Sequence, residues 1–157
     1  MTAETAPPPN TARLDALFRG DEYMGMIGAE LVEWEGGRAV VRWTPRPEHC
    51  NFAGTVHGGA IFSLADAAFS IASNSWGRVC VALTVEIHYL RAPSLDVPLV
   101  AVGTERSRGR RSASYLIEVR PEADPSELTA SFHAMVHRTG GWHFGDAAWP
   151  EDWRATQ

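Results

Sequence analysis

The chain has 157 residues, of which 45% are hydrophobic, and its formal net charge is −5. This length fits one domain with a hydrophobic core. The acidic balance argues against a general nucleic-acid-binding protein, because neutralising phosphates requires positive charge. Apolar stretches stay shorter than the roughly 18 residues of a membrane helix, and two cysteines do not make a disulfide framework. We therefore expect a cytoplasmic protein with no nucleic-acid or membrane partner.

The first half of the chain alternates turn-forming residues with short apolar patterns. The expected elements are, in chain order, a disordered arm over residues 1–10, an amphipathic helix over 11–19, two strands over 24–34 and 38–44, a loop over 49–56 and one long helix over 58–76. The turn Glu35-Gly36-Gly37 joins the two strands as a hairpin. The long helix is apolar nearly all round, which is typical of a buried helix.

The second half changes to a period of two, which indicates strands. The expected strands are 79–90, 97–106, 112–120 and 127–138. Their short connections favour antiparallel neighbours. We therefore predict an α+β fold, in which an antiparallel sheet of five or six strands wraps round one central helix. The domain is expected over 11–139, and the Trp-rich tail over 140–157 is expected to pack onto the body or onto a neighbouring molecule.

The segment from His57 to Asp66 has the composition of a catalytic site. Gly58 and Gly59 stand at the predicted helix start, where free N–H groups attract negative charge. Asp66 lies two turns further, and a carboxylate in an apolar helix is costly unless it has a partner or a task. These residues suggest an oxyanion donor and a base or nucleophile.

The spacing within this segment also predicts an oligomer. Eight residues separate Gly58 from Asp66, which is roughly 12 Å along a helix. Both groups must approach one reacting carbonyl to within about 3 Å. Two antiparallel helices in a symmetric dimer solve this problem, with Gly58 of one chain facing Asp66 of the other.

The run from Asn51 to Gly59, continued by 62–69, resembles the hotdog-fold acyl-CoA thioesterases, and most of all their PaaI (phenylacetate-pathway) branch. The resemblance covers about residues 12 to 139. It implies the hotdog fold, hydrolysis of an acyl-CoA such as phenylacetyl- or hydroxyphenylacetyl-CoA, and no metal or organic cofactor. It also implies a homodimer, joined sheet edge to sheet edge, as the minimal active unit. We expect pairing into a homotetramer, although the sequence does not decide between dimer and tetramer.

The same resemblance assigns roles to individual residues. Asp66 corresponds to the catalytic carboxylate, as nucleophile or general base, and the Gly58 N–H to the oxyanion donor. Asn51 corresponds to a loop asparagine near the reacting carbonyl, although shaping the loop is an equal alternative. His57 corresponds to the histidine that supports the loop. Weaker candidates for positioning the substrate are Gly59 and Thr84.

Further polar and aromatic residues carry weaker signals. Arginines that suit the CoA phosphates are Arg91, Arg106, Arg108, Arg110 and Arg111, with a solvated hairpin tip as the alternative reading of the last four. Side chains that hint at an aryl pocket, or simply belong to the core, are Phe62, Phe69 and Trp76. We reject a zinc site at His133 and His137, which lie about 13 Å apart on a strand. Two other functions stay open: a hotdog hydratase or dehydratase, and a non-catalytic acyl-CoA-binding protein.

Overall fold

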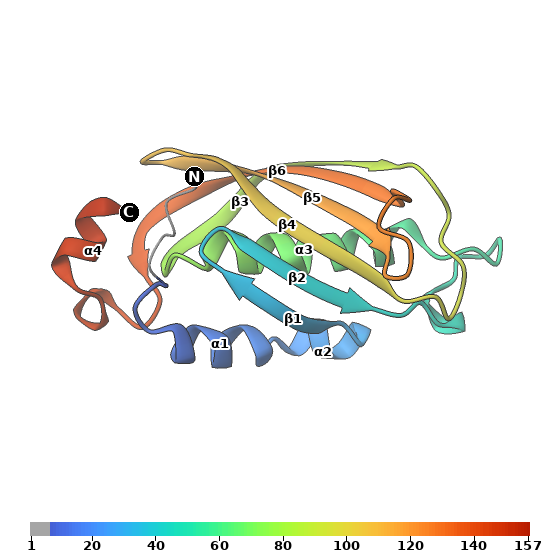
Figure 1. Cartoon of the computed structure of the whole chain (residues 1–157), viewed down its shortest axis with the longest axis horizontal. Coiled ribbons are helices and arrows are strands. Elements are labelled where there is room, and N and C mark those ends of the chain that lie inside the picture. The colour runs from blue at the N-terminus through green and yellow to red at the C-terminus, as the bar shows by residue number, and fades with distance from the viewer. Residues whose placement is uncertain (1–6) are drawn as a thin grey trace.

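The computed structural model describes residues 7–157, and its centre is one long helix enclosed by a curled sheet (Figure 1). The elements are α1 (Thr11–Arg19), α2 (Glu22–Ile27), β1 (Glu30–Glu35), β2 (Arg38–Trp43), a 3₁₀ turn (Pro47–His49), α3 (Gly58–Asn74), β3 (Arg78–Tyr89), β4 (Leu99–Arg108), β5 (Ser112–Pro121), β6 (Ala130–Trp142), a second 3₁₀ turn (Asp146–Ala148) and α4 (Glu151–Thr156). The strands pair antiparallel in the order β1-β2-β4-β5-β6-β3. The predicted α+β plan of a six-stranded sheet around one helix is confirmed.

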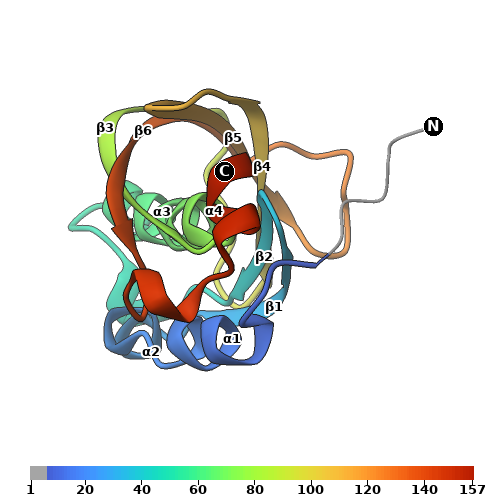
Figure 2. The ribbon, with the colours of Figure 1, turned by 90° about the vertical axis from the view of Figure 1, so that its left-hand side faces the viewer.

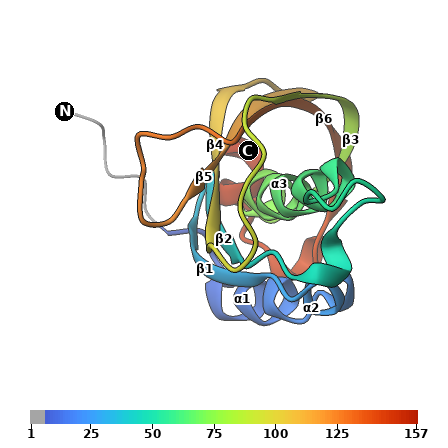
Figure 3. The same ribbon diagram turned by 90° about the vertical axis from the view of Figure 1, so that its right-hand side faces the viewer.

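Small side chains on α3 let the sheet curl closely around it (Figures 2 and 3). Ala65, Ala68 and Ala72 are fully buried and leave little bulk between the helix and the strands. The short helices α1 and α2 lie across the opening between the two edges of the sheet (Figure 3). No helix in the described part of the chain is long and apolar enough to cross a membrane.

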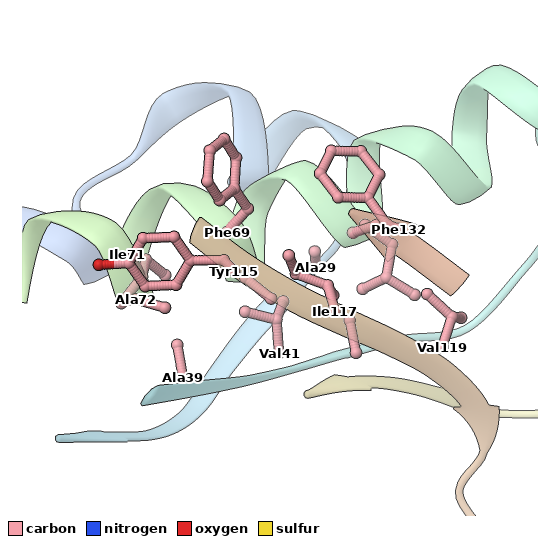
Figure 4. Close-up of a cluster of buried hydrophobic side chains, with 14 of the residues drawn as sticks. Ala29, Ala39, Val41, Phe69, Ile71, Ala72, Tyr115, Ile117, Val119 and Phe132 are labelled. Atoms are coloured by element: carbon pink, nitrogen blue, oxygen red, sulfur yellow. The ribbon is translucent and has the colours of Figure 1, made fainter. Parts of the chain in front are cut away.

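The core forms between α3 and the concave face of the sheet (Figure 4). Alternate residues of β5 point inward, including Tyr115, Ile117 and Val119. The Phe69 ring lies 5.7 Å from the Tyr115 ring and 5.8 Å from the Phe132 ring, in tilted or edge-on contacts. Such contacts stabilise more than the burial of area alone.

Helix α2 corrects the prediction of a strand over residues 24–34. The Asp21 carboxylate caps this helix by accepting a hydrogen bond from the Met24 N–H at 2.9 Å. Gly28 ends the helix in the left-handed conformation. These two end signals outweigh the apolar pattern between them, so β1 begins only at Glu30.

The Trp-rich tail packs against the end of α3. Trp149 is buried, and its ring centre lies 5.4 Å from that of Trp142, which itself ends β6. The Trp153 indole donates a hydrogen bond to the Trp76 carbonyl at 3.3 Å. In Figure 1, α4 therefore closes the end of the sheet opposite to the loop that precedes α3.

The expected disordered arm over residues 1–10 needs correction at its end. Residues 1–6 lie outside the described residues. Pro8 is buried, and the Asn10 side-chain amide donates a hydrogen bond to the Ala148 carbonyl at 2.8 Å. The end of this segment is thus tied to the tail through Asn10.

We predict that Gly77→Ala strongly destabilises the fold. Gly77 has a φ of +88°, and a Cβ there would clash with the Trp149 ring. The substitution must therefore strain the backbone and displace the buried tryptophan, at a cost of about 2 kcal/mol or more. Thermal unfolding followed by tryptophan fluorescence measures the loss. The control is Gly140→Ala, where a Cβ meets nothing within 4 Å; equal stability of the two variants would contradict this account of the tail.

Candidate active site

The start of α3 presents one free backbone N–H. His57 is the N-cap residue, and its Nδ1 accepts a hydrogen bond from the Gly59 N–H at 2.9 Å. The Gly58 N–H has no acceptor anywhere in residues 7–157. The positive end of the helix dipole adds to its attraction for an anion. This N–H can therefore stabilise negative charge that develops on a bound carbonyl oxygen.

The hydrogen bond accepted by His57 indicates which nitrogen of its neutral ring carries the proton. Because Nδ1 accepts a hydrogen bond, the neutral imidazole carries its proton on Nε2. The ring can then donate a hydrogen bond through Nε2, but it cannot take up a proton on Nδ1 without giving up the cap. This geometry favours the expected supporting role of His57 over proton transfer.

Asn51 shapes the loop that leads into α3. Its Oδ1 accepts hydrogen bonds from the N–H groups of Ala53 and Thr55, at 2.9 and 3.2 Å. Its Nδ2 donates to the Thr55 hydroxyl at 2.9 Å. These bonds occupy both ends of the amide, so they favour the loop-shaping alternative within a single chain.

A pocket of about 280 Å³ is lined by Gly58, the residue that carries the free N–H. Its lining residues are Val56, Gly58, Ile61, Tyr89, Leu90, Arg91 and Ala92. The walls are mostly apolar, and Arg91 brings a positive charge to the same pocket. The start of α3 and the end of β3 therefore form an apolar cavity with an anion-stabilising donor in its wall.

Asp66 is half-buried on α3, away from this pocket. Burial raises the pKa of its carboxyl, and the nearby negative charge of Asp21 raises the pKa further. A raised pKa makes the carboxylate a stronger base near neutral pH. No pattern in the sequence indicated the effect of Asp21, because it depends on how α2 packs against α3.

One chain does not bring Gly58 and Asp66 together. Both lie on α3, as expected, and Asp66 is absent from the lining of the Gly58 pocket. The rise of roughly 12 Å between them along the helix axis therefore stands. Within a single chain, the Gly58 N–H and the Asp66 carboxylate therefore cannot both reach the same reacting carbonyl.

Most of the remaining substrate-binding candidates lie outside the Gly58 pocket, in two other depressions of the surface. Thr84 and Arg106 line a different depression of about 360 Å³. Arg108 pairs with Glu105 at 3.3 Å and covers the Trp76 ring at 4.0 Å. Arg110 lines a third depression, beside α4. Of the candidate arginines in the described chain, Arg91 alone lines the Gly58 pocket.

The aromatic residues of α3 and Trp76, which follows it, do not line the Gly58 pocket either. Phe69 and Trp76 are buried in the fold, and the Phe62 ring packs on Phe132 at 5.2 Å. For these three residues, the contacts favour the alternative that their side chains belong to the core over an aryl-binding pocket. An acyl group next to Gly58 would instead contact Ile61, Tyr89 and Leu90.

Strand β3 carries exposed apolar side chains along an open edge. It pairs with β6 and has no other neighbour in the described sheet. Its residues Val81, Leu83, Val85 and Tyr89 are 39–57% exposed. An irregularity between Ala82 and Thr84 interrupts the expected alternation of faces along the strand. An exposed apolar edge of this kind is a surface ready to pair with another strand.

We predict that Asp66→Asn stabilises the fold at neutral pH. Because the folded pKa of Asp66 is raised, its ionisation disfavours folding, and the neutral amide removes that cost. The gain in melting temperature should be largest at about pH 8. It should vanish near the ordinary carboxyl pKa of about 3.9.

Asp15→Asn is the control with the opposite sign. Hydrogen bonds from Trp34 and Arg19 lower the pKa of Asp15, so its charge stabilises the fold at neutral pH, and that contribution fades on acidification. A melting temperature of Asp66→Asn below that of the wild type at pH 8 would contradict the assigned environment of Asp66.

Comparison with known proteins identifies the family. Residues 53–137 match the family model of the thioesterase superfamily. The chain is 33% identical over 132 residues to the acyl-coenzyme A thioesterase PaaI of Escherichia coli, covering 84% of this chain and 93% of that protein. The E. coli PaaI structure superposes with a TM-score of 0.78, at 30% identity over 84% of this chain and 97% of that one.

A second solved structure agrees with this result. A mutant of the phenylacetic acid degradation protein PaaI from Thermus thermophilus is 35% identical, with a TM-score of 0.71, and the match covers 76% of this chain and 100% of that chain. The two matches cover most of this chain and nearly all of each PaaI chain. The chain belongs to the thioesterase superfamily and has the hotdog fold of PaaI.

Proposed function

We propose that this protein hydrolyses an acyl-CoA thioester to a carboxylic acid and free CoA. The observation that carries the proposal is the free Gly58 N–H in the wall of an apolar pocket. The name of the E. coli relative, an acyl-coenzyme A thioesterase, supports the reaction. Both PaaI proteins of known structure are named for phenylacetic acid degradation, which supports phenylacetyl- or hydroxyphenylacetyl-CoA as the first substrates to test.

In the proposed mechanism, Asp66 starts the attack on the thioester carbonyl. It acts either as a general base that takes a proton from water or as a nucleophile that forms an anhydride, which water then hydrolyses. Negative charge develops on the carbonyl oxygen, and the Gly58 N–H stabilises it by roughly 2.7–4 kcal/mol. On either route the C–S bond breaks as the tetrahedral intermediate collapses, and CoA leaves as a thiolate that is protonated in water. On the nucleophilic route this step forms the anhydride before water attacks it, and on the general-base route Asp66 afterwards releases its proton. Arg91, in the same pocket, is the candidate contact for a CoA phosphate.

The proposed active unit is a homodimer in which each site takes Gly58 from one protomer and Asp66 from its partner. The axial separation of the two groups within a chain supports this arrangement. The exposed apolar edge of β3 supports pairing of two sheets through this strand. Further pairing into a homotetramer is part of the proposal, and light scattering on the purified protein measures it.

Asp66→Asn tests the reaction itself. Loss of the base or nucleophile should lower kcat about 100- to 10,000-fold, while the variant stays folded and oligomeric. Release of CoA is followed with a thiol reagent across a panel of acyl-CoA thioesters. Unchanged turnover would overturn the role of Asp66. Tight acyl-CoA binding without turnover in the wild type would instead identify a non-catalytic binder, and hydration of an enoyl-CoA would identify a hydratase.

Mixing two inactive variants tests the shared site. Gly58→Pro removes the free N–H at the first position of α3, where the backbone conformation of a helix suits proline. Its Cβ would lie 3.2 Å from Tyr89 Cζ, so the Tyr89 ring must shift by a few tenths of an ångström to accommodate it. When Gly58→Pro and Asp66→Asn chains mix at random, half of the dimers are heterodimers. In each heterodimer one site lacks both groups, and the other site combines the intact Gly58 of one chain with the intact Asp66 of its partner. Coexpression should therefore restore about a quarter of wild-type activity. No recovery in proven heterodimers would show that each site is built within one chain.

Asp21→Asn should shift the pH dependence of turnover. The negative charge of Asp21 raises the pKa of Asp66, so its removal lowers that pKa. The acid limb of the kcat profile should move to lower pH, because Asp66 stays ionised further into acid. The amide can still accept the capping hydrogen bond from Met24. An acid limb that does not move would contradict either the effect of Asp21 on the pKa of Asp66 or the role of Asp66 in turnover.

A further inference from the structure

The peptide group between Gly58 and Gly59 is held at both ends by side chains. The Tyr89 hydroxyl donates a hydrogen bond to the Gly58 carbonyl oxygen at 3.0 Å. The Gly59 N–H donates to His57 Nδ1 at 2.9 Å. Tyr89 ends strand β3, and His57 immediately precedes α3. Side chains from two different elements therefore fix the plane of one peptide group.

The neighbouring peptide, which carries the Gly58 N–H, is also held. Its carbonyl, that of His57, accepts hydrogen bonds from the Ala60 N–H at 2.9 Å and the Ile61 N–H at 3.3 Å. The carbonyl and the N–H of a planar peptide point in opposite directions, so these bonds also aim the Gly58 N–H. Gly58 thus lies between two fixed peptide planes, and its N–H donates to no acceptor within residues 7–157.

The two glycines make room for the two side chains that hold them. A Cβ on Gly58 would lie 3.2 Å from Tyr89 Cζ, and a Cβ on Gly59 would lie 3.1 Å from His57 Nδ1. Both distances are shorter than ordinary contacts of a Cβ. The glycine pair therefore matches the close approach of Tyr89 and His57, and glycine at both positions leaves the backbone more conformational freedom than other residues would, which these side chains restrict.

We propose that Tyr89 is a positioning residue, which together with His57 clamps the Gly58–Gly59 peptide and so keeps the Gly58 N–H aimed at the reacting oxygen. This rests on the proposed role of Gly58 as the oxyanion donor. Preorganised donors are effective because they need no reorganisation during the reaction. The hydroxyl of Tyr89 acts through the backbone, while its ring forms part of the pocket wall.

Tyr89→Phe tests the clamp by removing one hydroxyl and keeping the ring. Loss of a hydrogen bond of ordinary strength should lower kcat about 3- to 10-fold. The KM should stay unchanged, because the pocket wall is preserved. In ¹⁵N-glycine-labelled protein, the Gly59 amide should exchange its hydrogen several-fold faster than in the wild type, because its peptide is released on one side. The exchange measurement needs no substrate.

Tyr115→Phe is the matched control. The Tyr115 hydroxyl donates to Glu105 at 2.8 Å, toward the far end of α3, so its loss should lower the melting temperature but leave kcat and the Gly59 exchange unchanged. Unchanged Gly59 exchange in Tyr89→Phe would overturn the clamp, whatever happens to kcat. If the wild type hydrolyses no acyl-CoA, the proposed function fails, and faster Gly59 exchange in Tyr89→Phe would still establish the clamp.

Discussion

The burial of α3 inside the curled sheet determines what each polar group along the helix can do. A helix surrounded by apolar side chains gives a carboxylate little solvation, so Asp66 has a raised pKa. The enclosure is not complete, because Ser63, Asp66 and Ala67 are half-buried and Ser70 is exposed on one face of the helix. Backbone groups that lack a partner within the helix occur only at its ends. The half-buried carboxylate in the middle and the free N–H at the start therefore both follow from how α3 sits in the sheet.

The two ends of α3 differ in how far neighbouring side chains cover them and satisfy their polar groups. At its far end, Glu105 accepts hydrogen bonds from the Trp76 indole and the Tyr115 hydroxyl and pairs with Arg108. Burial and the charge of Glu105 raise the pKa of Tyr115 above its usual range, which keeps its proton in this network. The tryptophans of the tail cover the same end. At the near end, Gly58 keeps a free N–H beside an open pocket.

Most of the fold follows from local signals in the sequence. Residues 11–19 form the expected helix because their apolar side chains recur at helical spacing, and the glycine turn joins β1 to β2 because turn chemistry is local. Helix α2 was missed because its apolar residues suit a strand, although Asp21 and Gly28 mark its ends. The segment from His57 to Asp66 predicted three groups of the candidate site, namely the His57 ring, the Gly58 N–H and the Asp66 carboxylate. Tyr89 was missed as a fourth, because its contact with Gly58 exists only after β3 folds back beside α3.

The position of β3 in the sheet has a consequence for folding. This strand follows α3 directly in the chain, but its partner is β6, about fifty residues later. Until β6 forms, both edges of an apolar strand lack hydrogen-bond partners, and pairing over such a separation is slow. The strand that is best suited to join two protomers is therefore also the segment most exposed to aggregation while the chain folds. Rapid association of finished protomers would protect the same edge afterwards.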